Sequence, residues 1–336
     1  MNSTSFNFSK IFDCQASQID IFSTTCLPLL DDLIKNKKSG LIFAYGLTNA
    51  GKTHTIIGNP TNPGILPLAL KTIYEKIENE IKSKNLETNP ELFCNYIEIY
   101  NEEIFDFLAN DGKANKCKKK VHIKERDKIF YVHSKHKILI YINIHYIDVT
   151  NKQIKSIDDF NEALNLGIMK KTHAATQLNN YSSRSHTIFK LILRWQGCKS
   201  NTFSDSEDPN EAEYEESTLS IVDLAGSERA YRAETSGKEL QQACKINTSL
   251  YVLGKCMEIM KYNSLYVNKK IVPFRESKLT MLFQEYFQGD QNIIMITNIN
   301  PSREDFEETL RVLSYSCIAK EIRPIKSKII TTNNIR

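Results

Sequence analysis

The chain has 336 residues, enough for one large α/β domain or two small ones with a sizeable core. Hydrophobic residues make up 41% and charged residues 25% of it, and the formal net charge is +4, as is ordinary for a globular protein. No apolar run approaches a membrane-spanning length, the first residues lack the apolar core of a signal peptide, and the eight cysteines form no Cys-x-x-Cys pair. We therefore expect a cytosolic or nuclear protein, and exclude membrane-spanning, disulfide-framed and zinc-ribbon classes.

The first third of the chain alternates predicted strands and helices. Residues 6–13 alternate apolar and polar as a short strand does, and Gln18–Leu33 has an amphipathic helical pattern. The apolar run Leu41–Tyr45 predicts a buried strand. An apolar stripe over residues 66–81 predicts a helix, and Phe93–Tyr100 predicts another strand.

Two charged stretches follow. Residues 113–137 are dense in Lys, Arg and His, which is typical either of a solvated hairpin whose lysines protect an edge strand or of a basic surface for an acidic partner. Residues 205–216 carry seven acidic side chains and no base, so we interpret them as a solvent-exposed loop insertion.

The rest of the chain continues the alternation. Predicted strands are Ile188–Trp195, Thr218–Val222 and Ile293–Ile299, and predicted helices are 246–260, Ser277–Phe287 and Phe306–Cys317. Strands that alternate with helices predict a single α/β domain whose central, mostly parallel sheet has helices on both faces.

A phosphate-binding loop follows the strand Leu41–Tyr45. It comprises Gly46, Leu47, Thr48, Asn49, Ala50, Gly51, Lys52 and Thr53. The two glycines let the backbone N–H groups turn inward toward a polyphosphate. Lys52 would reach the β- and γ-phosphates, and Thr53 would offer its hydroxyl to Mg²⁺. The alternative is an ordinary strand-to-helix turn. The loop predicts a P-loop NTPase fold without choosing among kinases, GTPases, ATPases and motors.

Two further stretches fit a nucleotide site. Asp223, at a predicted strand end and three residues before Gly226, has the spacing of a carboxylate near Mg²⁺ and a flexible N–H near the γ-phosphate. Ser182 and Ser183, beside Arg184, suit a loop that touches Mg²⁺ and γ-phosphate. Glu228 is a plausible bidentate partner for Arg184.

Together these motifs resemble a kinesin motor domain. The resemblance runs from about residue 6 to about residue 326, and its motifs are Gly46–Thr53, Glu98–Glu102, Asn179–His186, Asp223–Glu228, Ile246–Leu250, Val272–Thr280 and Glu308–Lys320. Leu47 within the phosphate loop makes the chain similar to the mitotic kinesin-like branch of the central spindle.

The resemblance implies ATP and Mg²⁺ as cofactors. It places His54 beside the adenine and Thr53, Ser183 and Asp223 near the metal. The residues that it implies in hydrolysis are Ser182, Ser183, Arg184, Gly226 and Glu228, with Arg184 and Glu228 as a salt bridge that closes the site.

The resemblance also implies microtubules as the partner, with neither nucleic acid nor membrane. Arg275 and Lys278 match tubulin-facing positions, and Lys238 and Lys245 are expected in a loop that faces tubulin too. The implied activity is microtubule-stimulated ATP hydrolysis with plus-end movement in mitosis or cytokinesis. The implied location is the cytoplasm, on microtubules and possibly the spindle, with homodimerisation through a coiled coil outside this chain.

One departure concerns the N-terminus. Kinesin motors begin with a strand that ends in Arg-x-Arg-Pro, and none precedes Phe6, so we expect an N-terminally incomplete motor over residues 1–322 and the start of a neck linker over 323–336. A GTPase would need an Asn/Thr-Lys-x-Asp motif, which is absent, and a myosin motor is far longer. The remaining alternative is a non-catalytic microtubule-binding protein with a relic or incomplete nucleotide site.

Overall fold

A mixed sheet organises the computed structural model, which describes residues 4–83, 90–109, 119–129, 140–147, 149–177, 184–196, 214–228, 238–289 and 291–322. Within these residues the strands are β1 (Gly40–Gly46), β2 (Gly58–Asn59), β3 (Asn62–Pro63), β4 (Glu91–Tyr100), β5 (Glu103–Asp106), β6 (Lys119–Ile129), β7 (Ile140–Ile147), β8 (Lys152–Gln153), β9 (His186–Gln196), β10 (Tyr214–Asp223) and β11 (Asn292–Asn298). The helices are α1 (Gln18–Lys35), α2 (Lys52–Ile56), α3 (Ile65–Lys82), α4 (Ile157–Gln177), α5 (Lys238–Leu265), α6 (Lys278–Gln288) and α7 (Phe306–Lys320), with short 3₁₀ turns η3 (Phe274–Glu276) and η4 (Arg303–Asp305).

The main sheet has the order β11-β1-β10-β9-β4-β5-β6-β7, with β8 beside β4, while β2 and β3 form a separate hairpin. The α/β fold with helices on both faces is confirmed, but the expectation of mostly parallel strands is wrong. Of the described pairings, only those of β1 with β10 and with β11 are parallel. The other pairings are antiparallel, and several join strands that are consecutive in the chain, such as β4–β5, β6–β7 and β9–β10. The short turn between β4 and β5 allows only antiparallel pairing of those two strands, whereas parallel pairing needs a crossover.

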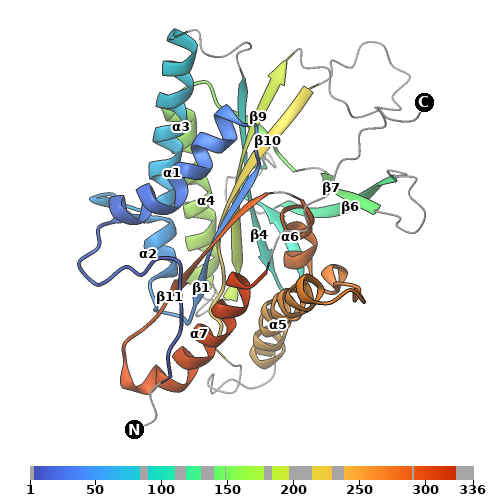
Figure 1. Cartoon of the computed structure of the whole chain (residues 1–336). Coiled ribbons are helices and arrows are strands. Elements are labelled where there is room, and N and C mark those ends of the chain that lie inside the picture. Colours follow the sequence, from blue (N-terminus) through green and yellow to red (C-terminus); the bar gives the residue numbers. More distant parts are fainter. Residues whose placement is uncertain are drawn as a thin grey trace, which may run out of the picture.

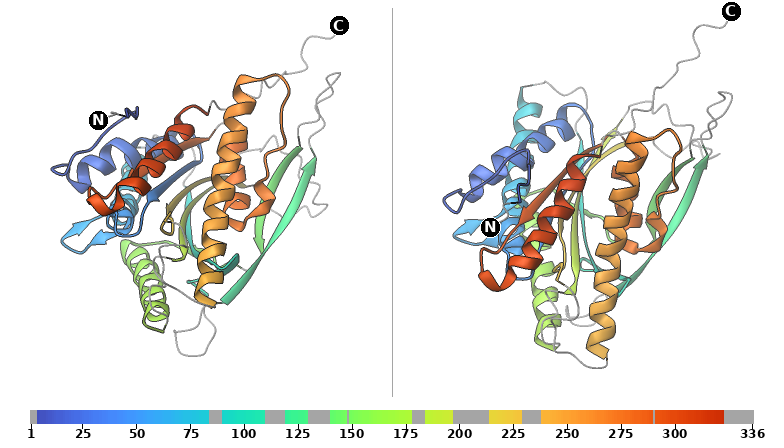
Figure 2. Two further views of the ribbon diagram at one scale, coloured as in Figure 1. Left: turned by 90° about the horizontal axis from the view of Figure 1, so that it is seen from below. Right: turned by 60° about the horizontal axis from the view of Figure 1, so that its bottom comes forward.

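Two layers of helices cover the sheet (Figure 1). On one face α1, α3 and α4 pack against Ile42 and Ala44 of β1, and on the other α5, α6 and α7 pack against Leu41, Phe43 and Tyr45. All seven residues of β1 are buried, which explains its unbroken apolar sequence. Figure 2 shows α5 and α7 side by side on the second face.

The start of α1 follows from local chemistry. The hydroxyl of Ser17 accepts a hydrogen bond from the N–H of Asp20, and the carboxylate of Asp20 accepts one from the N–H of Ser17 at 2.9 Å. This capping box satisfies two backbone donors at the helix end. The amphipathic pattern then buries Phe22, Leu30 and Leu33 in the core.

Two local expectations have different outcomes. Residues 6–13 form no strand, because an alternating pattern needs a neighbouring strand to pair with. The basic stretch contributes β6, which pairs with β7 as a hairpin, while most of 113–137 and the acidic residues 205–213 lie outside the described residues. Glu215 and Glu216 lie in β10 rather than in a loop, and pair with Lys37 and Arg194.

Strand β11 lies at the edge of the sheet. Within the described chain it pairs with β1 alone, and all seven of its residues are half-buried. Among the described helices, none is long and apolar enough to cross a bilayer.

Candidate functional site

The predicted phosphate loop connects the buried end of β1 to α2. Gly51 is the N-cap of α2 and has φ of 95°, in the left-handed region that other residues rarely adopt. At Gly46 a Cβ atom would lie 2.1 Å from the carbonyl oxygen of Asn298 at the end of β11, so only glycine fits there. The strand, turn and helix predicted around this loop are therefore confirmed, and the N–H groups of Lys52 and Thr53 lie at the start of a helix, where they lack intrahelical acceptors.

Lys52 lies inside the loop with only 7% of its surface exposed. Its Nζ donates to the carbonyl oxygens of Gly46 at 2.9 Å and Leu47 at 2.6 Å. Burial lowers the pKa of Lys52, while the nearby carboxylates of Asp223 and Glu228 favour its charged form. The loop thus holds a cation between two carboxylates, in a place suited to a polyphosphate.

Asp223 ends β10 beside the loop, as predicted. Its Oδ2 accepts a hydrogen bond from the hydroxyl of Thr53 at 2.7 Å, and its Oδ1 is buried with no hydrogen-bond partner. A carboxylate oxygen with free lone pairs, beside a hydroxyl oxygen, is a donor set that Mg²⁺ prefers. The residues present therefore fit a magnesium ion.

Lys171 of α4 is a site residue that the sequence reasoning missed. Its Nζ lies 3.3 Å from Oδ2 of Asp223, and both side chains are buried, with 10% and 4% of their surfaces exposed. A lysine in the middle of a helix carries no signal of such a contact, since its partner is 52 residues away in sequence. Lys171 balances the charge of Asp223 within the core.

We expect Lys171→Met to destabilise the protein by about 3 kcal/mol, because it removes the cation that pairs directly with the buried Asp223 carboxylate. Urea unfolding monitored by circular dichroism measures the change. The matched control is Lys71→Met, which removes the exposed 3.9 Å pair with Glu75 and should cost less than about 0.5 kcal/mol. Equal stability of Lys171→Met and wild type would contradict the assignment.

Gly226 and Glu228 lie in the loop after β10, directly against the phosphate loop. The carboxylate of Glu228 accepts hydrogen bonds from the N–H of Thr48 at 2.8 Å and from its hydroxyl. A Cβ on Gly226 would lie 2.2 Å from Oγ1 of Thr48, so a side chain at this position would displace the loop. In this structure a carboxylate oxygen of Glu228 therefore satisfies the N–H of Thr48.

The expected salt bridge between Arg184 and Glu228 is not formed in this structure. Arg184 is half-buried just before β9, and the ion pairs between described residues do not include one with Glu228. Its positive charge acts instead on Tyr100, where it opposes the rise in pKa that burial causes. Ser182 and Ser183 lie outside the described residues.

His54, in α2, is held by a second residue that sequence reasoning missed. Gln18 is 3% exposed, and its side-chain amide donates to the carbonyl oxygen of His54 at 2.7 Å. The same nitrogen lies 3.1 Å from Nδ1 of His54. Gln18 therefore fixes the orientation of the exposed imidazole beside the phosphate loop.

Comparison with known proteins agrees with this geometry. The family model of the kinesin motor domain matches residues 1–322. The chain belongs to the kinesin motor domain family. It is 31% identical to "Kinesin-like protein KIF23" of Mus musculus over 393 residues, which cover 97% of this chain and 40% of that protein. The chain thus spans about two fifths of that relative's length.

Solved kinesin structures share the fold. The structure titled "Structure of a fast kinesin: Implications for ATPase mechanism and interactions with microtubules" has a TM-score of 0.77 and 28% identity, and the match covers 99% of this chain and 85% of that one. A KIF14 dimer with AMP-PNP, in complex with a microtubule, has a TM-score of 0.71 and 30% identity over 91% of this chain and 78% of that one.

The four basic residues expected to face tubulin lie on the α5, α6 and α7 layer of the kinesin fold. Lys238 and Lys245 belong to the first turns of α5, so the expectation that they lie in a loop is wrong; strong helix formers such as Glu239, Leu240 and Ala243 continue the helix there. Arg275 is exposed in η3, and Lys278 begins α6.

The start of α6 is fixed by a turn from the sheet. Glu102, between β4 and β5, accepts hydrogen bonds from the N–H of Lys278 at 2.7 Å and from the hydroxyl of Ser277 at 3.2 Å. Glu102 and Asn101 both have positive φ, near 60°. The Glu98–Glu102 motif of the kinesin family thus anchors the helix that presents Lys278.

His186, in the same motif as Arg184, makes the stability of the fold depend on pH. Burial, with the charges of Lys52 and Lys171, lowers its pKa from 6.5 to about 3. The unfolded chain takes up a proton below about pH 6.5, whereas the folded chain does not until about pH 3. The free energy of unfolding is therefore unaffected by His186 above about pH 6.5. It decreases as the pH falls below this value, because only the unfolded chain gains the proton.

We expect His186 to make the kinesin fold less stable at about pH 5 than at about pH 7.5 by roughly 2 kcal/mol. Urea unfolding of wild type and His186→Asn at the two pH values measures this contribution. The variant should lose less stability on acidification than wild type. An identical loss in both proteins would contradict the assignment.

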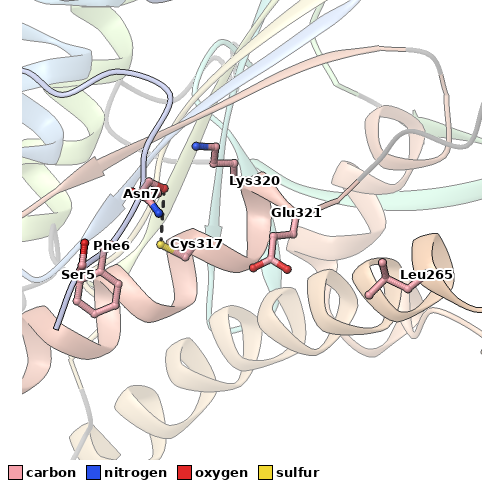
Figure 3. A pocket seen from close by; sticks show the side chains of 7 residues that line it. All are labelled: Ser5, Phe6, Asn7, Leu265, Cys317, Lys320 and Glu321. Carbon is pink, nitrogen blue, oxygen red and sulfur yellow. Dashed lines mark hydrogen bonds between the residues drawn. The ribbon is translucent and has the colours of Figure 1, made fainter.

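A cavity of about 590 Å³ lies beside the ends of α5 and α7 (Figure 3). It is lined by Ser5, Phe6, Asn7, Leu265, Cys317, Lys320 and Glu321. Cys317 of α7 contacts the carbonyl oxygen of Asn7, and Glu321 pairs with Lys261 of α5 at 2.6 Å. The cavity contains no predicted site residue, and marks the contact of the N-terminal segment with the ends of α5 and α7.

Proposed function

We propose that this chain is a motor domain that hydrolyses ATP, is stimulated by microtubules and moves along them. The observation that carries the proposal is the meeting of Lys52, Thr53, Asp223 and Glu228 at one glycine-bounded loop. A phosphate-binding cation, oxygen ligands for Mg²⁺ and a loop that would sense the γ-phosphate are the parts that phosphoryl transfer requires.

The roles follow from these contacts. Lys52 and the N–H groups at the start of α2 would bind the phosphates, while Thr53 and Asp223 would hold Mg²⁺. When bound, Mg²⁺ neutralises negative charge on the phosphates. Gly226 offers a backbone N–H beside Thr48, and its lack of a side chain keeps the loop close. Hydrolysis then depends on positioning and electrostatics rather than on a covalent intermediate.

Glu228 is the residue whose contacts change in this proposal. In the structure it binds Thr48, and in the closed site it would pair with Arg184, with Ser182 and Ser183 contacting γ-phosphate and Mg²⁺. Transfer of Glu228 from Thr48 to Arg184 would move the loop after β10 when ATP binds.

Microtubules are the proposed partner. The basic residues Lys238, Lys245, Arg275 and Lys278 lie in one helical layer, and the KIF14 structure is a complex with a microtubule. Similarity to KIF23 supports a role in the mitotic kinesin-like branch, on cytoplasmic and spindle microtubules. We further propose that the motor moves toward the plus end. The motor domain would end near residue 322, before a neck linker, and segments outside this chain would form a homodimer.

Cosedimentation with polymerised tubulin tests the proposal. A motor binds microtubules with different affinity in ADP and in AMP-PNP, because its nucleotide site is coupled to its track-binding face. Binding that weakens with salt but is the same in both nucleotides would favour the alternative of a passive microtubule-binding protein.

A further inference from the structure

Gln18 is a buried amide whose hydrogen-bonding groups are used unevenly. It is the first residue of α1, and 3% of its surface is exposed. Its Nε2 lies 2.7 Å from the carbonyl oxygen of His54 and 3.1 Å from Nδ1 of the same residue. Its Oε1 is buried and has no hydrogen-bond partner among the described residues. The amide nitrogen therefore serves His54 twice, while the amide oxygen is left unsatisfied.

The carbonyl oxygen of His54 fixes the direction in which the amide of Gln18 is turned. A carbonyl oxygen can only accept a hydrogen bond, so the amide nitrogen must face it. A reversed amide would place two acceptor oxygens against each other, and the hydrogen-bond network therefore excludes it.

The amide of Gln18 in turn fixes the tautomer of His54. The same nitrogen donates toward Nδ1, so Nδ1 carries a lone pair and the ring holds its hydrogen on Nε2. His54 is exposed in α2, directly after Thr53. The free edge of the imidazole thus offers an N–H donor beside the phosphate loop, and in this tautomer it cannot offer an acceptor.

This arrangement disfavours the fold and yet orients an exposed side chain. A buried oxygen that lacks a donor destabilises a protein, whereas water can satisfy an exposed imidazole without help. Local rules of this kind are broken mainly where a side chain serves function, and buried hydrogen bonds commonly orient the histidines that bind a ligand. A buried amide devoted to one exposed ring therefore indicates that this ring contacts a ligand.

We infer that Gln18 is a positioning residue that sets His54 to donate its Nε2–H to a hydrogen-bond acceptor on the nucleoside of the bound nucleotide. This inference rests on the proposed function, in which the polyphosphate occupies the loop that ends at Thr53. The acceptors of a nucleoside are ring nitrogens of the base and oxygens of the ribose. The exocyclic amine of adenine is a donor, and it cannot pair with this tautomer.

Nitrogen NMR of the histidine rings tests the tautomer without any nucleotide. The sequence has seven histidines, and the signals of His54 are those that disappear in His54→Phe. In wild type we expect a hydrogen on Nε2 of His54 and none on Nδ1. Gln18→Met keeps a long side chain without an amide, so both tautomers of His54 should be present in it.

Gln284→Met is the matched control for Gln18→Met. Gln284 is another buried glutamine, 5% exposed, but its amide donates to Gln288 of the same helix, α6, at 2.9 Å. Its variant should leave the ring signals of His54 unchanged. An equal change in both variants would show general damage instead of a specific contact.

Analogues of ATP that each lack one acceptor test the contact with the nucleoside. They are 7-deaza-, 3-deaza- and 1-deaza-ATP for the base and 2′-deoxy- and 3′-deoxy-ATP for the ribose, in competition with a fluorescent ADP analogue. One of them should bind wild type roughly fivefold more weakly than ATP, as expected for loss of one hydrogen bond. This difference should vanish in His54→Phe and shrink in Gln18→Met, but persist in Gln284→Met.

The outcomes separate this inference from the proposed function. A hydrogen on Nδ1 of His54 in wild type would overturn the inference, as would analogue affinities that His54→Phe leaves unchanged relative to ATP. So would a loss, dependent on His54, with an ATP analogue that lacks only the exocyclic amine. A wild-type chain that binds no ATP would overturn the proposed function, and the inference with it.

Discussion

Lys52→Ala is expected to abolish nucleotide binding, weakening the affinity for ATP by at least about 100-fold. The reason is that Lys52 is the buried cation of the phosphate loop, held by the carbonyl oxygens of Gly46 and Leu47 beside the position that the phosphates would take. Binding of ATP with Mg²⁺ should raise the melting temperature of wild type by mass action, and this rise should disappear in the variant. Differential scanning fluorimetry at increasing ATP concentration measures both.

Lys190→Met is the matched control for this prediction. Lys190 is also a buried lysine, 9% exposed, but it pairs with Glu285 of α6 at 3.0 Å rather than lying in the loop. Its variant should melt at a lower temperature and yet keep the full rise with ATP. A rise with ATP in Lys52→Ala equal to that of wild type would refute the assignment of the phosphate loop.

Glu228→Gln is expected to bind ATP but to hydrolyse it at least about 100-fold more slowly. The amide keeps the shape of the side chain and an acceptor for the N–H of Thr48, but it has no charge with which to pair with Arg184. Loss of the carboxylate also removes a negative charge near Lys52, so ATP affinity should be equal or higher. Single-turnover hydrolysis by rapid quench separates the binding step from the chemical step.

Glu216→Gln controls for loss of a carboxylate elsewhere. Glu216 pairs with Arg194 at the surface of β10 and β9, far along the strand from Asp223. Its variant should hydrolyse ATP at the wild-type rate. Wild-type turnover in Glu228→Gln would remove Glu228 from the mechanism.

The contiguous parts of the site could be predicted from the sequence. Gly46, Gly51, Lys52 and Thr53 lie within eight residues, so one strand-turn-helix pattern fixes their relative positions. Asp223 was predictable because the end of a buried strand beside a phosphate loop is a frequent place for a magnesium-binding carboxylate.

Contacts between distant segments could not be predicted in this way. Gln18 with His54, Lys171 with Asp223 and His186 with Ser249 depend on how helices dock on the sheet, which no local pattern encodes.

The prediction of mostly parallel strands was wrong for a related reason. An apolar run shows that a strand is buried, but it does not report whether neighbouring strands such as β9 and β10 run parallel or antiparallel. In residues 6–13 apolar and polar side chains alternate as in a strand, but no strand forms because no neighbouring strand pairs with them.

The central claim is that nucleotide chemistry at the loop is coupled to a microtubule. The most direct test is steady-state ATP hydrolysis by this chain with and without polymerised tubulin, beside a Glu228→Ala control. We expect strong stimulation by microtubules in wild type and none in the control. Microtubule binding without ATP turnover in wild type would contradict the account and favour a passive microtubule-binding protein.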